Sequence, residues 1–366
     1  EAARVLLQAV TETARGTKEQ PAALPRRATN VLVEMCSQYE DAETLSAVAD
    51  LVFEEERGVT LTPLVLESKH PPLVAVATLV DHRLGASHLP PGSTALTKER
   101  RRACEQLDAL LEDKDHAAQA GALQVRLVRA RLAMDLGDLD AAERIADAIL
   151  KDLPHQRNAR LLQALIALER GETAEAEDKL LALKTDSPNW QAVKIFYARA
   201  ALDTGNRERA REALRSVTEG QVLRTPQAAW EKQLLAEVTQ ARLILAQSLL
   251  KDGLAEEALN ETQQILKTDA VPPQAIYLHF WSAVCAGQPG LAEEPLARGL
   301  TRYPKEPALL QMVLAYPESL EAPTATDAAA SEKKQRLAVA HDTLKAAARA
   351  VLAKEPANPN ALALRV

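Results

Sequence analysis

The chain has 366 residues and a formal net charge of −7, and 47% of its residues are hydrophobic. Only 3% are aromatic, too few for the stacking platforms of single-strand binders, and the acidic balance argues against nucleic acid as the main partner. No apolar run approaches the roughly 18 residues of a membrane span. Few glycines together with many Ala, Leu, Glu and Arg residues predict an all-helical chain.

The first 117 residues predict helices that glycine and proline interrupt. The helices are expected at 1–15, 27–38, 41–57, 72–84 and 97–113, with Gly58, Pro63, Pro71-Pro72 and Pro90-Pro91-Gly92 between or inside these pieces. We interpret residues 1–117 as degenerate helix pairs stacked on the same rod as the residues that follow. A separate small helical domain is the alternative.

A regular repeat begins after this region. Gly137, Gly171 and Gly205 follow one another at a spacing of thirty-four positions, and Gly253 and Gly287 are separated by the same spacing. Alanine stands five residues after each glycine, at Ala142, Ala176, Ala210, Ala258 and Ala292. Alanine also stands seven residues before four of them, at Ala130, Ala164, Ala198 and Ala246, and Phe280 occupies the fifth position. Proline stands seventeen positions after three of the glycines, at Pro154, Pro188 and Pro304.

Each spacing has a physical reason. The glycine ends a first helix and lets the backbone turn. The two alanines allow paired helices to approach closely, and the proline closes the second helix because it cannot continue the hydrogen-bond ladder. The residues between are amphipathic at helical spacing.

In these features, residues 120–306 resemble the tetratricopeptide repeat (TPR) family. The resemblance implies an all-α solenoid of antiparallel helix pairs in a right-handed superhelix, in which each repeat buries its apolar face against its neighbours. We expect three repeats at 118–222, an insertion at 223–238 and two repeats at 239–306. The usual large aromatic residues of the family are mostly replaced by Leu, Ile or Ala.

The remaining segments depart from the period. The stretch 226–250 is expected to form one long helix that starts at Pro226. Residues 307–366 are expected to be an irregular loop plus a partial repeat, with Ser331 capping a helix at 332–354. Residues 354–361 predict a turn followed by a new helix, and we expect the chain to be a piece of a longer protein.

The resemblance places two apolar rows at or near a concave groove. One row lies ten residues before each glycine (Leu127, Leu161, Ile195, Leu243 and Tyr277) and the other three residues before (Met134, Leu168, Leu202, Leu250 and Val284). Either these rows pack between helices, or they form an apolar trough for a partner segment. Our predicted partner-binding residues are Leu127, Arg131, Leu161, Ile195, Arg199, Leu202 and Leu243, with the arginines orienting the partner.

A row of cations accompanies the apolar rows. Arg126, Arg160, Lys194 and Arg242 each lie eleven residues before a glycine. They are either solvated side chains at the edge of the stack or an anchor for acidic side chains or an anionic polymer.

Signs of catalysis are weak. No metalloprotease, hydrolase or nucleotide-binding motif occurs in the sequence, and the three cysteines are widely separated. Asp81, His82 and His88 form the one tight group of possible metal ligands, which we interpret as a solvated loop. We therefore predict no enzyme activity, no cofactor and no metal site.

These features predict a non-catalytic scaffold or adaptor that binds a peptide or helix in the concave groove. The expected partner is a protein or peptide, possibly an anionic polymer, with no nucleic acid and no membrane span. The alternative is the TPR portion of a larger polysaccharide-export or secretion assembly.

Overall fold

The computed structural model of the chain describes residues 2–15, 24–39, 42–54, 59–86, 93–219, 229–268, 271–303 and 327–354. In this part of the chain all regular elements are helices, apart from an isolated antiparallel bridge between Phe53 and Leu61. The result confirms the predicted all-α class. The chain divides into two compact units, one formed by Glu1–Pro188 and Ala228–Glu231 and the other by Asn189–Gln227 and Lys232–Val366.

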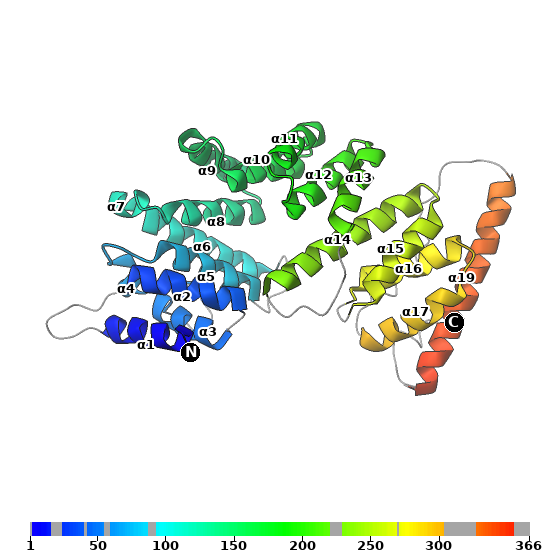
Figure 1. Cartoon of the computed structure of the whole chain (residues 1–366), viewed down its shortest axis with the longest axis horizontal. Coiled ribbons are helices and arrows are strands. Elements are labelled where there is room, and N and C mark those ends of the chain that lie inside the picture. Colours follow the sequence, from blue (N-terminus) through cyan, green and yellow to red (C-terminus); the bar gives the residue numbers. More distant parts are fainter. Residues whose placement is uncertain are drawn as a thin grey trace. The chain divides into compact units, whose positions relative to one another are not determined.

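The first unit contains the helices α1 to α11 (Figure 1). Their bounds are α1 Ala2–Arg15, α2 Arg26–Tyr39, α3 Ala42–Val52, α4 Pro63–Leu66, α5 Leu73–Ala86, α6 Thr94–Glu112, α7 Lys114–Ala117, α8 Ala122–Asp135, α9 Leu139–Asp152, α10 Arg157–Glu169 and α11 Thr173–Asp186. Consecutive helices pack in pairs, α8 on α9, α9 on α10 and α10 on α11.

The N-terminal helices agree with the sequence prediction except around residue 52. The helix expected at 41–57 ends at Val52, because Phe53 leaves the helix to pair with Leu61. The phenyl ring of Phe53 is buried and carries the Arg83 guanidinium 4.5 Å from its centroid. The short helices α4 and α7 have no counterpart in the prediction, since four residues are too few to show a helical period.

A continuous apolar core joins the N-terminal helices to the first repeat. Buried side chains from α1, α2, α3, α5 and α6 belong to the same cluster as Val125, Val128 and Leu132 of α8. At Gly121, just before α8, an added Cβ would lie 2.8 Å from the Cβ of Leu73. The lack of a side chain there lets the start of α8 approach α5 closely.

The second unit contains the helices α12, α13, α15, α16, α17 and α19, together with α14 from residue 232 onward (Figure 1). Their bounds are α12 Gln191–Asp203, α13 Arg207–Thr218, α14 Ala229–Lys251, α15 Ala255–Leu266, α16 Pro273–Cys285, α17 Gly290–Arg302 and α19 Asp327–Lys354. Helix α14 begins close to the predicted position, although Pro226 lies outside the described residues. The cap predicted at Ser331 is wrong, because α19 begins at Asp327 and Ser331 lies inside it. The part of the predicted irregular segment before residue 327 and the new helix predicted after residue 354 lie outside the described residues.

The repeat glycines end their helices as the spacing predicts. Gly137, Gly171, Gly205, Gly253 and Gly287 all have φ between 70° and 86°. At the first of them, the N–H of Gly137 donates to the carbonyl of Met134 and the N–H of Asp138 donates to that of Ala133, each at 2.9 Å. This pair of bonds is the Schellman motif, which satisfies carbonyls at the end of the helix and needs a residue in the left-handed region.

Replacing Gly171 by Ala is therefore expected to lower the free energy of unfolding by about 1–2 kcal/mol, because a Cβ disfavours the left-handed conformation. No neighbouring atom lies within 4 Å of the position that a Cβ would take there, so backbone conformation alone sets the loss. The measurement is urea denaturation followed by circular dichroism. Gly290→Ala is the control, since that glycine also has open space but no positive φ; an equal loss in both variants would contradict this reasoning.

A buried histidine of α16 contacts both α15 and α17. His279 is 2% exposed, its Nδ1 is 3.0 Å from the Thr262 hydroxyl, and its Nε2 is 3.0 Å from the Leu291 carbonyl. Since a carbonyl only accepts, Nε2–H donates to Leu291. The Thr262 hydroxyl also donates to the carbonyl of Leu259 at 2.9 Å. Burial lowers the pKa of His279 below its ordinary value of 6.5, against the smaller opposing effect of the Leu291 hydrogen bond.

The lowered pKa of His279 predicts a loss of stability in acid. As the pH falls below about 6.5, the unfolded chain binds a proton at this position while the folded chain resists it, so unfolding becomes easier. We expect His279→Gln to reduce the difference in melting temperature between pH 7 and pH 5. The control is His155→Gln, which changes an exposed ring and should leave that difference as it is. A wild-type difference retained in His279→Gln would mean that other groups set the acid sensitivity.

Candidate partner-binding surface

The structure divides the predicted contact residues by burial. Leu127 and Ile195 are only 7% and 2% exposed, and Leu127 packs with Ala130, Ala146, Ile149, Ala159 and Leu162. Arg131, Leu161, Leu202 and Leu243 are partly exposed, and Arg199 is exposed. The row ten residues before the glycines is therefore partly core and partly surface.

Helix α10 carries an apolar stripe that remains partly exposed. Leu161, Leu165 and Leu168 are all intermediate in exposure, and their spacing of four and three residues places them on the same side of the helix. Buried Leu162 and Ile166 lie on other sides. Leu165 and Leu168 were not among the predicted contact residues, although the spacing from Leu161 was a signal for both.

Arg131 is held by a neighbouring helix. Its guanidinium pairs with Asp81 of α5, and both side chains are about two-fifths exposed. Asp81 belongs to the predicted group of possible metal ligands. His82 is exposed, and His88 lies outside the described residues. Within the described ranges, no group of three or more His, Cys, Asp or Glu residues could hold a metal ion.

The predicted cation row is largely engaged by the chain itself. Arg160 pairs with Asp186 at 2.6 Å, and Arg126 donates to the carbonyl of Ala117 at 3.4 Å. Arg242 is buried and binds Glu261 and the Thr218 carbonyl. Lys194 is half-buried on α12. Three of the four cations thus join elements of their own unit.

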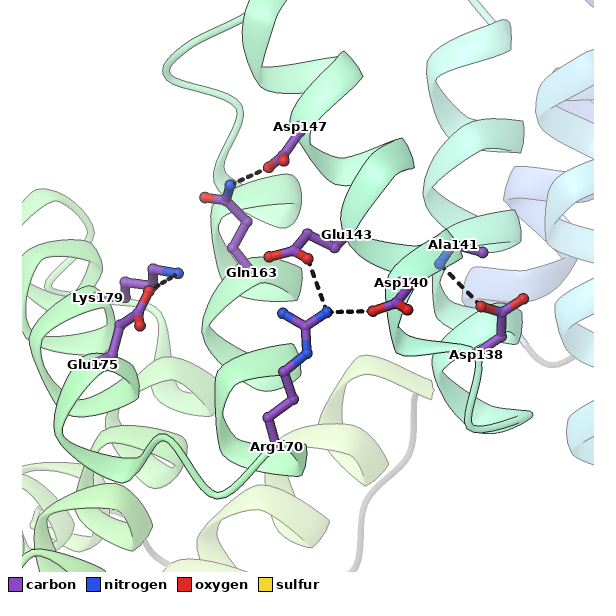
Figure 2. Close-up of polar contacts among 9 residues, drawn as sticks. All are labelled: Asp138, Asp140, Ala141, Glu143, Asp147, Gln163, Arg170, Glu175 and Lys179. Atoms are coloured by element: carbon purple, nitrogen blue, oxygen red, sulfur yellow. Dashed lines mark hydrogen bonds and ion pairs between the residues drawn. The ribbon is translucent and has the colours of Figure 1, made fainter.

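Polar contacts link the first two repeats between α9 and α10. Figure 2 shows Arg170 between α9 and α10, where one Nη lies 2.8 Å from both Asp140 and Glu143. The hydrogen bond from Arg170 lowers the pKa of the Glu143 carboxyl. Gln163 of α10 donates to Asp147 of α9 at 2.6 Å, and Asp138 caps α9 by accepting from the N–H of Ala141 at 3.0 Å. These contacts align α10 against α9.

The second unit repeats this link with the charges exchanged. Arg170 precedes its glycine by one residue, and Glu143 follows the glycine of the preceding repeat by six. At the same two positions around Gly205 and Gly253, Arg211 pairs with Asp252. At these two junctions the ion pair thus forms in either polarity.

The described part of the chain offers little for catalysis. The side chains of Cys36 and Cys104 are buried, and burial raises the pKa of Cys104, which reduces its thiolate fraction and reactivity. Both ring nitrogens of His116 face backbone carbonyls, of Leu110 at 3.1 Å and of Ser68 at 2.8 Å. Among the described helices, none is long and apolar enough to cross a bilayer.

Comparison with known proteins identifies the repeats. No curated protein matches the chain significantly. The model of the tetratricopeptide repeat family matches residues 127–189 and 198–275, and these ranges contain four of the five glycines with positive φ. Residues 127–189 and 198–275 thus consist of tetratricopeptide repeats.

Proposed function

We propose that this protein is a non-catalytic scaffold that binds a peptide or helix of a partner protein. Tetratricopeptide repeats generally mediate protein–protein interaction, and they are built for it because stacked helix pairs create an extended surface. The observation that carries the proposal is the partly exposed stripe of Leu161, Leu165 and Leu168 on α10. An amphipathic partner segment would lay its apolar face on a stripe of this kind.

The proposed contacts follow from exposure. In the first unit they are Leu161, Leu165, Leu168 and Arg131. In the second unit they are Arg199, Leu202 and Leu243. Leu127 and Ile195 support these residues from the core, because their side chains are too deeply buried to touch a partner.

The test is site-specific photo-crosslinking in extracts of the source cells. A photoreactive amino acid replaces Leu165 in one variant and the exposed Ala182 of α11 in a control variant. The expected result is a discrete crosslinked polypeptide with the probe at position 165 and none at position 182. Equal crosslinking from both positions, or none from position 165, would reject α10 as the docking face.

The polysaccharide-export or secretion assembly remains a prediction of the sequence. If this alternative is correct, the complete reading frame encodes an adjoining membrane, barrel or enzyme region. Sequencing the frame tests this alternative. An adjoining region of this kind would be compatible with the scaffold role, since the repeats would then recruit a partner to the assembly.

A further inference from the structure

A small cavity of about 210 Å³ opens in the first unit beside the start of the repeats. It lies between the turn that follows α7, the N-terminal half of α8 and the C-terminal end of α9. Its walls include Ala120, Leu123 and Ile149, with Leu153 at 47% exposure near the surface. The volume is below the 300–1,000 Å³ of sites for drug-sized ligands, so the cavity suits one small molecule.

Two opposite charges line this apolar cavity. Arg126 comes from α8 and Asp152 from the last residue of α9. Within the described ranges, no ion pair joins them. The guanidinium of Arg126 donates instead to the carbonyl of Ala117 at 3.4 Å, which uses one of its five N–H groups.

In the next repeat, the residues at the same two positions form an ion pair. Arg160 and Asp186 stand one full repeat period after Arg126 and Asp152, and they form an ion pair at 2.6 Å. The first repeat differs in what precedes it, because α7 and its turn supply the Ala117 carbonyl to Arg126. Arg126 is thus bonded to a backbone carbonyl where Arg160 has its carboxylate, although Arg126 and Asp152 line the same cavity.

We propose that this cavity binds one free aliphatic α-amino acid. The ligand carboxylate accepts hydrogen bonds from Arg126, the ligand ammonium donates to Asp152, and the aliphatic side chain packs on Leu123 and Ile149. The two charges of the zwitterion thus give Arg126 and Asp152 the opposite charges that Arg160 and Asp186 give each other in the second repeat. A ligand with only a negative charge would lie close to the unpaired carboxylate of Asp152, which repels it. A ligand with only a positive charge would meet the same repulsion from Arg126.

The inference is independent of the docking face on α10. It concerns a small ligand at another place in the unit, and Arg126, Asp152 and the cavity walls include none of the proposed partner contacts. Failure of one proposal therefore leaves the other standing.

Isothermal titration calorimetry of the full chain with L-leucine tests the site. Isovalerate, which lacks the ammonium group, and isopentylamine, which lacks the carboxylate, are the matched ligands. We expect L-leucine to bind at least about tenfold more tightly than either, since each lost charge-assisted contact weakens binding by about that factor. Equal binding of isovalerate would show a simple anion site, and the absence of L-leucine binding at millimolar concentration would overturn the proposal.

Variants locate the binding within the chain. Asp152→Asn and Arg126→Gln should each weaken L-leucine binding about tenfold or more, whereas Asp186→Asn and Arg160→Gln should leave it unchanged. Asp152 is exposed, so its variant keeps the test valid if Arg126→Gln disturbs folding, which circular dichroism would report. Unchanged affinity in folded Asp152→Asn, or an equal loss in Asp186→Asn, would contradict the assignment.

Discussion

Replacing Phe280 by Ala is expected to lower the free energy of unfolding by about 3–5 kcal/mol, the range for deletion of a fully buried phenyl ring. Phe280 is 0% exposed and packs edge-on against Trp281, with ring centroids 5.1 Å apart and an interplanar angle of 83°. The four other repeats have alanine at this position. The fifth repeat is therefore built around a large side chain, and the variant leaves a cavity that rigid helices cannot close.

Urea denaturation followed by circular dichroism measures this loss. The control is Leu291→Ala in α17, because Leu291 is 44% exposed and truncation of a surface side chain usually changes stability by less than about 0.5 kcal/mol. A loss below about 1 kcal/mol for Phe280→Ala would show that neighbouring side chains relax into the space.

The converse change, Ala164→Phe in α10, should also destabilise the chain, by about 1–3 kcal/mol or more. Ala130, Ala164, Ala198 and Ala246 are all 0% exposed, so each contacts packed neighbours on every side. A phenyl ring at position 164 must push α10 away from the helices that enclose it.

A surface variant of the same kind isolates this packing effect. Ala182→Phe places the ring on the exposed side of α11, where only helix propensity changes, by a few tenths of a kcal/mol. The comparison is again by urea denaturation. A similar loss in both variants would mean that position 164 tolerates a large side chain and that close approach of the helices does not require alanine.

Positions that depend on local geometry could be predicted from the chain alone. Each repeat glycine ends a helix because only a residue with a positive φ closes the Schellman motif, and the regular spacing identified all five. The end of α3 could not be predicted in this way. Its helical pattern continued past Val52, but pairing of Phe53 with Leu61 and the contact with Arg83 took the chain out of the helix.

In the candidate sites too, the position of a residue in the repeat could be predicted, but its burial and its partners could not. Leu127 and Leu161 have the same register, yet the former is core and the latter is partly exposed. Arg126 and Arg160 also share a register, yet only Arg160 finds its carboxylate. Because both members of each pair have the same position in the repeat, the period alone predicts the same burial and the same contacts for both.

The amino-acid sequence by itself determined the helical class, the repeat period, the turns between paired helices and the small buried residues, since each of these depends on backbone conformation or on spacing within one repeat. Only the tertiary structure decided which members of a row are buried and which charges meet. Those outcomes depend on the helices packed beside each repeat, and the first repeat has the N-terminal helices beside it where the second has another repeat.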